Sequence, residues 1–223
     1  MSEADWRQRC QAGLAFFGQI TAGVTHEIKN HLATIKEQSG LMADLLEMAA
    51  RGRPVDVERL NRLAVGILNR IPAADAIVRH LNQFAHSVDE SNQEMDLNEV
   101  VDNVAAVSQR QAAMKKLSIF ADIDSEPVII RSSPFFVRQI ICASLQAAMG
   151  VAEKNDRIDV RVRNLNDSVE CRFQGCRVNL PEMEELSNHL EIIRSYLGAV
   201  LNLEDTGELR LSFPRNMPGA DCV

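Results

Sequence analysis

A histidine, an acid and an amide occur within one apolar-periodic stretch, as His26, Glu27 and Asn30. A helix advances about 100° per residue, so His26 is turned roughly 200° away from Val24 and Ile28 of the apolar stripe. Its imidazole is therefore expected in solvent, with Asn30 one turn along on the same face. An exposed imidazole acts as a nucleophile when a neighbouring carboxylate takes its ring proton. The alternative is an ordinary surface histidine, and the spacing alone does not decide between the two.

The stretch that carries these residues has the periodicity of one long amphipathic helix, from about residue 4 to residue 50. Its apolar stripe comprises Leu14, Phe17, Ile20, Val24, Ile28, Leu32, Ile35, Met42 and Leu45. Gly52 and Pro54 end the helix, because Gly suits a C-terminal cap and Pro cannot continue the hydrogen-bond ladder. A second helix is expected over residues 55–88, and Pro72 is predicted to kink it or to force a local restart.

The short connection between these helices predicts an antiparallel helical hairpin over residues 1–90. A single hairpin of this length cannot bury both of its apolar faces. Two-helix units commonly solve this problem by pairing into a four-helix bundle. We therefore expect a homodimer in which the hairpin is the dimerisation and histidine-bearing domain.

A second domain is expected after a polar linker at residues 89–94. Asp96 has the position of a helix N-cap. Helices are expected over about 97–116, 134–153 and 181–197, and strands over 117–123, 128–130, 157–163, 168–173 and 209–213. This order predicts an α/β sandwich over residues 91–223, with helices on one face of a mixed sheet. Its predicted core positions are Ile140, Ile141, Leu145, Val160, Val162, Val169 and Phe173.

Composition narrows the function classes. Hydrophobic residues make up 46% and aromatic residues 4% of the chain, which favours helical packing through aliphatic side chains. The net charge is −7 and no basic stripe with interleaved aromatics occurs, so no nucleic acid partner is expected. No stretch approaches the length of a membrane span, so no membrane partner is expected either. Five scattered cysteines, among them Cys171 and Cys176, favour reduced thiols, a cytoplasmic location and no structural metal.

Residues 17–30, which include His26, resemble the H box of bacterial two-component sensor histidine kinases. Residues 96–101 resemble the start of that family's ATP-binding domain, and residues 137–141 resemble the start of its N-box helix. The resemblance implies that His26 is a phosphoacceptor, that Glu27 orients it or acts as general base, and that Asn30 positions water or the phosphoryl group. It also implies a homodimer, with a response-regulator receiver domain and an upstream kinase as further partners.

The resemblance weakens after residue 140. The two N-box asparagines of the family, the second of which helps to bind Mg²⁺, align with Cys142 and Gln146. Gln174 takes the place of the Asp that reads the adenine amino group, and no Gly-rich phosphate loop or lid is identifiable. We therefore expect a degenerate ATPase-like domain that uses no cofactor, with ATP and Mg²⁺ binding lost. His31 stands where the family commonly has Pro, and a surface or bundle residue is a simpler interpretation than a second phosphoacceptor.

Three functions stay open from the sequence. The first is phosphotransfer or phosphatase activity on a receiver domain through His26, without ATP. The second is a non-catalytic scaffold, a pseudokinase that dimerises and docks a regulator or a kinase. The third is an ATP-dependent sensor kinase in which Gln146 places an amide oxygen on Mg²⁺. We favour the first, because His26, Glu27 and Asn30 are present beside a degenerate nucleotide site.

Overall fold

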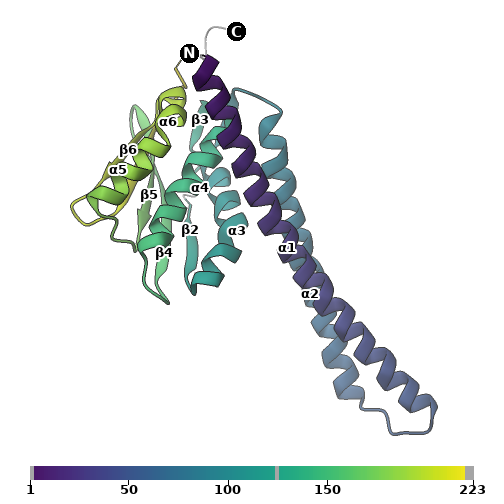
Figure 1. The fold of residues 1–223 in the computed structure, drawn as a ribbon. Coiled ribbons are helices and arrows are strands. Elements are labelled where there is room, and N and C mark those ends of the chain that lie inside the picture. Colours follow the sequence, from purple (N-terminus) through teal and green to yellow (C-terminus); the bar gives the residue numbers. More distant parts are fainter. Residues whose placement is uncertain (1–2, 124–125, 219–223) are drawn as a thin grey trace.

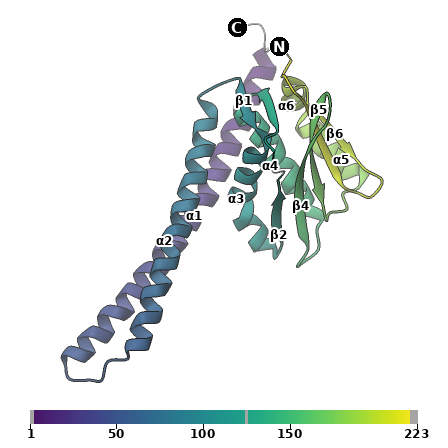
Figure 2. The ribbon, with the colours of Figure 1, turned by 180° about the vertical axis from the view of Figure 1, so that it is seen from behind.

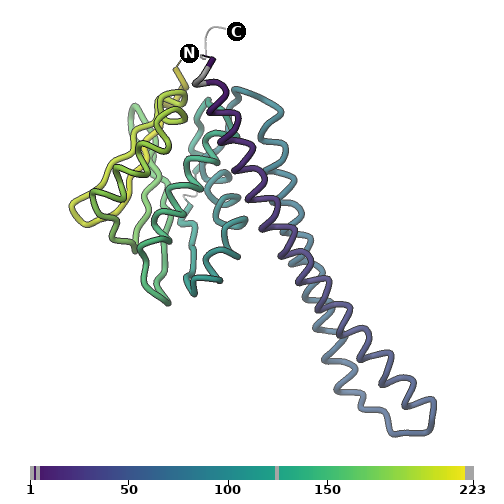
Figure 3. The backbone as a smooth tube through the Cα atoms, in the orientation of Figure 1, coloured from purple at the N-terminus to yellow at the C-terminus, as the bar shows by residue number. Residues whose placement is uncertain are grey.

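The computed structural model describes residues 3–123 and 126–218. Figure 1 shows a long helical hairpin beside a more compact α/β unit, and the tube in Figure 3 follows the same path. The hairpin consists of α1 (Glu3–Ala50) and α2 (Val57–Ala85), and α2 continues into a 3-10 turn, η1 (His86–Val88). Its far end projects well beyond the α/β unit, so only the near half of the hairpin is packed against other elements (Figures 1 and 2).

The ends of the hairpin helices follow from local sequence. Gly52, with a φ of +85°, takes the left-handed conformation that a tight turn after α1 requires. Asp56 caps α2 by accepting a hydrogen bond of 2.9 Å from the backbone N–H of Arg59. Pro72 lies inside α2, which runs through it as one helix, so the local restart, one of the two predicted alternatives, does not occur.

The α/β unit contains two sheets. β1 (Gln93–Asp96) pairs antiparallel with β3 (Ile129–Ser132). The larger sheet has the order β2-β4-β5-β7-β6, in which β2 and β4 are parallel and the other neighbours are antiparallel. Its strands are β2 (Ser118–Asp122), β4 (Arg157–Asn164), β5 (Ser168–Gln174), β6 (Val200–Leu203) and β7 (Leu209–Pro214). The expected mixed sheet is confirmed.

Four helices cover one face of the larger sheet, and the strands are uncovered when seen from behind (Figures 1 and 2). They are α3 (Leu97–Lys115), α4 (Pro134–Val151), α5 (Leu180–His189) and α6 (Glu191–Leu197). All seven predicted core positions lie between the helices and the sheet and are at most 5% exposed. The expected class, a helical hairpin followed by an α/β sandwich, is therefore confirmed.

Three local expectations need correction. The single helix expected over 181–197 is two helices, because the chain turns at Leu190 and buries that side chain. The short edge strand β6 was not predicted, and β1 begins inside the expected linker. By length and composition α4 is apolar enough to span a membrane, contrary to expectation, but more than half of it is buried inside the protein, as in a core helix.

The apolar stripe predicted for α1 is only partly buried. Ile20 and Val24 are buried as expected, whereas Leu14 and Leu32 are exposed in the single chain. The buried strip runs instead through Arg9, Gly13, Phe16, Ile20 and Val24. This spacing is also helical, but the buried strip faces the α/β unit as well as α2. Both the α/β unit and α2 contact the first half of α1.

A row of three arginines crosses the uncovered face of the sheet. Arg161 is in register with Arg172, which is in register with Arg210. Like charges directly opposite one another on neighbouring strands destabilise a sheet. Glu170 offsets this repulsion, because its buried carboxylate lies 3.0 Å from Arg172 Nη2 and 3.6 Å from Arg210 Nε.

Replacing Glu170 with Gln is therefore expected to lower the free energy of unfolding by about 2 kcal/mol, since two adjacent arginines lose their shared counter-charge. Urea denaturation of both proteins measures this difference. The matched control is Glu204→Gln, which removes a half-exposed partner of Arg210 and should cost about 0.5 kcal/mol or less. Equal losses in the two variants would contradict the role given to Glu170.

Candidate functional site

The structure places His26 and Asn30 in solvent, one helical turn apart on α1. Glu27 is half-buried and directed to a different side of the helix, since consecutive residues are about 100° apart. No hydrogen bond joins His26 to Glu27 in the described part of the chain. The imidazole and the amide are thus exposed together on one side of α1, and the carboxylate reaches them only by a change of rotamer.

Glu27 lines a cleft of about 270 Å³ between α1, α2 and α3. His31, one turn further along α1, lines the same cleft, opposite His80 of α2 and Gln109 of α3. The Nδ1 atom of His31 is buried and meets no hydrogen-bond partner among the residues described. His31 therefore belongs to the packed side of α1, and His26 to its open side.

Of the two N-box positions that the sequence indicated on α4, Cys142 faces α3, whereas Gln146 lines the groove between α4 and α5. Cys142 is fully buried on the side of α3, 3.9 Å from Ser108 Oγ, and burial raises the pKa of its thiol to about 12. Gln146 donates a hydrogen bond of 3.3 Å to Gln111 of α3. Cys142 is therefore in no position to meet a ligand in a groove next to α5.

The groove between α4 and α5 has a volume of about 500 Å³. On the α4 side its lining includes Ala143, Ala147 and Gly150, together with Gln146. Three of these four positions have no side-chain group that could coordinate a cation. The α5 side contributes Glu182, Glu185, Leu186 and His189.

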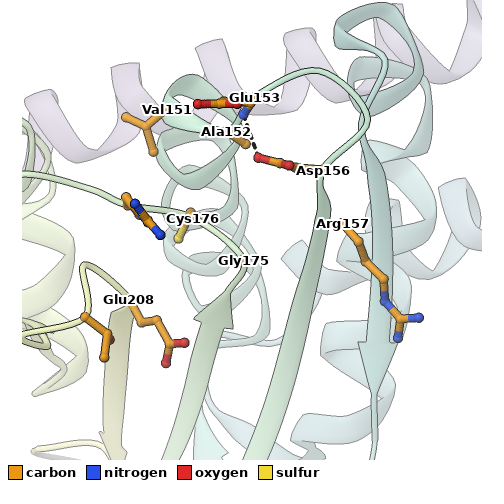
Figure 4. A pocket seen from close by; sticks show the side chains of 10 residues that line it. Val151, Ala152, Glu153, Asp156, Arg157, Gly175, Cys176 and Glu208 are labelled. Carbon is orange, nitrogen blue, oxygen red and sulfur yellow. Dashed lines mark hydrogen bonds between the residues drawn. The ribbon is translucent and has the colours of Figure 1, made fainter.

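A larger pocket, of about 600 Å³, lies where α4 ends and β5 leaves the sheet (Figure 4). Gln174 is the last residue of β5, and its Nε2 donates a hydrogen bond of 3.2 Å to Glu208 Oε2, which lines the pocket. Gly175 follows with a φ of +83°, and a Cβ there would lie 2.1 Å from the carbonyl oxygen of Arg157. The sequence reasoning missed Glu208, because β7 brings this carboxylate to Gln174 from 34 residues away.

The described cysteines are free thiols, and three of them are buried. Burial raises the pKa of Cys171 and of Cys176, so both are poor nucleophiles at neutral pH. Cys222 lies outside the described residues.

Comparison by sequence finds distant relatives that are histidine kinases. No family model matches the chain. It is 22% identical over 170 residues to the signal transduction histidine-protein kinase AtoS of Escherichia coli, which covers 75% of this chain. It is 25% identical over 154 residues to the sensor histidine kinase ZraS of Klebsiella oxytoca, which covers 69% of this chain. The matches span only 26% and 32% of those relatives' own lengths.

Solved structures similar to this one include histidine kinases at low identity. The catalytic domain of histidine kinase ThkA has a TM-score of 0.49 and 14% identity, over 57% of this chain and 99% of that one. The kinase AdeS of Acinetobacter baumannii has a TM-score of 0.47 and 12% identity, over 81% and 96% of the two chains.

Proposed function

Because this chain is a distant relative of two-component sensor histidine kinases, we propose that it transfers or removes phosphoryl groups on a response-regulator receiver domain through His26, without using ATP. Residues 1–90 form the dimerisation and phosphoacceptor part, and residues 91–223 form a degenerate ATPase-like part. The observation that carries this proposal is the exposed pair of His26 and Asn30 on the open side of α1.

In the transfer step, the lone pair of His26 Nε2 attacks the phosphorus of the receiver's aspartyl phosphate. The new P–N bond forms as the P–O bond to the aspartate breaks, and the aspartate leaves as a carboxylate. The proton on the other ring nitrogen passes to Glu27 after a rotamer change, which neutralises the phosphorylated imidazolium. Positioning supplies most of the catalysis in such a transfer, so an exposed, fixed helix face is a suitable site.

In the phosphatase reaction, water attacks the same phosphorus as the P–O bond to the aspartate breaks. The aspartate leaves as a carboxylate, and inorganic phosphate is released with the oxygen and protons of the water. The Asn30 side-chain amide, one turn from His26, orients that water. Neither reaction needs a nucleotide. On the α4 side of the groove, Ala143, Ala147 and Gly150 offer no cation ligand, and Gln174 carries an amide in place of a carboxylate. These two observations support the proposed loss of ATP and Mg²⁺ binding.

A homodimer completes the hairpin. Leu14 and Leu32 of α1 are exposed in the single chain, and so are Val65, Leu68 and Ile71 of α2. Pairing two hairpins into a four-helix bundle buries apolar side chains of this kind. The free buried thiols also favour a cytoplasmic location.

The test is transfer of ³²P from receiver domains of the source organism, labelled with acetyl phosphate, to the purified chain. We expect label on the chain, or faster loss of label from the receiver, and no label from [γ-³²P]ATP alone. Label from ATP would overturn the ATP-independent mechanism. A receiver that binds the chain but neither transfers its phosphoryl group to it nor is dephosphorylated would favour the non-catalytic scaffold function.

Asn30→Ala should separate the two reactions. We expect transfer to His26 within a few-fold of wild type, but receiver dephosphorylation about 10- to 100-fold slower, because the attacking water loses its positioning group. The measurement is the decay of receiver phosphate in single-turnover reactions. Lys29→Ala, at the exposed neighbouring position, is the control and should leave the decay unchanged. Unchanged dephosphorylation in Asn30→Ala would exclude the assigned role.

One observation favours residual nucleotide binding as a second candidate. Glu208 brings a carboxylate to within 3.2 Å of Gln174, beside the pocket of about 600 Å³. A carboxylate there can accept a hydrogen bond from an exocyclic amino group. Titration of wild type and Glu208→Gln with a fluorescent ATP analogue tests this, and binding that depends on Glu208 would favour the sensor kinase reading.

A further inference from the structure

The aromatic residues of this chain are concentrated at one junction. The chain has eight Phe, one Tyr and one Trp. Six of these ten form a continuous series of ring contacts, which we call the aromatic series. Its members are Phe16 and Phe17 of α1, Phe84 of α2, Phe135 and Phe136 of α4, and Tyr196 of α6.

The aromatic series connects the hairpin to the α/β unit. Phe84 lies 5.4 Å from Phe16 and 6.1 Å from Phe135, measured between ring centroids. Phe136 continues the series at 5.4 Å from Phe135 and 5.4 Å from Tyr196. Rings at these separations attract one another beyond their area burial. Adjacent elements are thereby joined from α2 to α6.

Arg9, in the N-terminal turns of α1, contacts the last two rings of this series, Phe136 and Tyr196. Its side chain is buried, with the residue only 8% exposed. Its guanidinium carbon lies 4.0 Å from the ring centroid of Tyr196 and 5.2 Å from that of Phe136. Its Nη1 is buried, and no acceptor among the described residues meets it. A buried guanidinium held by ring faces is a contact that depends on close alignment of α1 with α6.

The approach of α1 to α4 is also close. A Cβ at Gly13 would lie 3.1 Å from Cε1 of Phe135, so a glycine lets the two helices pack at this point. Arg9 and Gly13 are one turn apart on the buried strip of α1. A small rotation of α1 would therefore move both off their partners.

We propose that Arg9, Phe136 and Tyr196 form a latch that couples the position of the first turns of α1 to α6. Turning α1 releases Arg9 from the rings and frees α6. Because α5 joins α6 at the buried Leu190, the release also reaches the wall of the α4–α5 groove. This coupling is independent of any reaction at His26.

Backbone hydrogen exchange tests the latch in the full chain. Arg9→Ala and Tyr196→Leu should each raise exchange at least tenfold in residues 191–197 and in the first turns of α1, with residues 157–174 of the sheet unchanged. Tyr196→Phe keeps a ring under the guanidinium and should keep the protection. Arg7→Ala, an exposed arginine that pairs with Glu3, is the control and should change nothing.

Two results would overturn the latch. One is unchanged exchange over residues 191–197 in both Arg9→Ala and Tyr196→Leu. The other is an equal rise in every segment, the sheet included, together with a matching fall in global stability. That second pattern would make Arg9 an ordinary packing residue of the core, with no selective coupling to α6.

Discussion

His26→Ala is expected to lose phosphoryl acceptance from a labelled receiver domain by at least about 100-fold. The reason is chemical, because alanine has no nitrogen lone pair and no other described imidazole lies on the open side of α1 with Asn30. The exposed position of His26 means that its removal disturbs no packing. The free energy of unfolding should therefore stay within about 0.5 kcal/mol of wild type.

The matched control for this variant is His31→Ala. His31 is half-buried beside Glu27 and lines the cleft toward α2 and α3, so it is turned away from an approaching receiver. We expect His31→Ala to accept label at a rate within a few-fold of wild type. Acid-labile label that survives in His26→Ala and disappears in His31→Ala would move the phosphoacceptor to the second imidazole.

Phe84→Ala is expected to lower the free energy of unfolding by about 3–4 kcal/mol. Phe84 is 1% exposed and touches rings from α1 and α4, so its removal leaves a cavity where the hairpin and the α/β unit meet. The surrounding helices are held from several sides and cannot close such a cavity fully. Equilibrium denaturation in urea, followed by circular dichroism, measures the loss.

Phe120→Ala provides the comparison for Phe84. Phe120 is 50% exposed on β2 and lies under the guanidinium of Arg157, with 4.2 Å between the guanidinium carbon and the ring centroid. Its removal forfeits one exposed cation–π contact and little buried area, so the loss should be about 1 kcal/mol. A loss below about 1 kcal/mol for Phe84→Ala would show that the junction is not a packed core.

The amino-acid sequence by itself determined the elements with strong local patterns. The 3.6-residue period predicted α1 and α2, and alternation with turn residues predicted the pairing of β4 with β5. Asp96 caps α3 by accepting a hydrogen bond from the backbone N–H of Asn98, two residues along the chain, so this capping effect is readable locally. The exposed setting of His26 followed from the same periodicity, because it depends only on angles around one helix.

Only the tertiary structure decided which side of each helix meets which neighbour. The first half of helix α1 packs against α3, α4 and α6 as well as against α2, so its buried strip includes Arg9 and leaves Leu14 exposed. The side of α4 that faces the groove, and the approach of Glu208 to Gln174, depend on β7 and α5, which are distant in sequence. Periodicity within one element reports that an apolar face exists, whereas the identity of its partner is set by contacts that no local pattern contains.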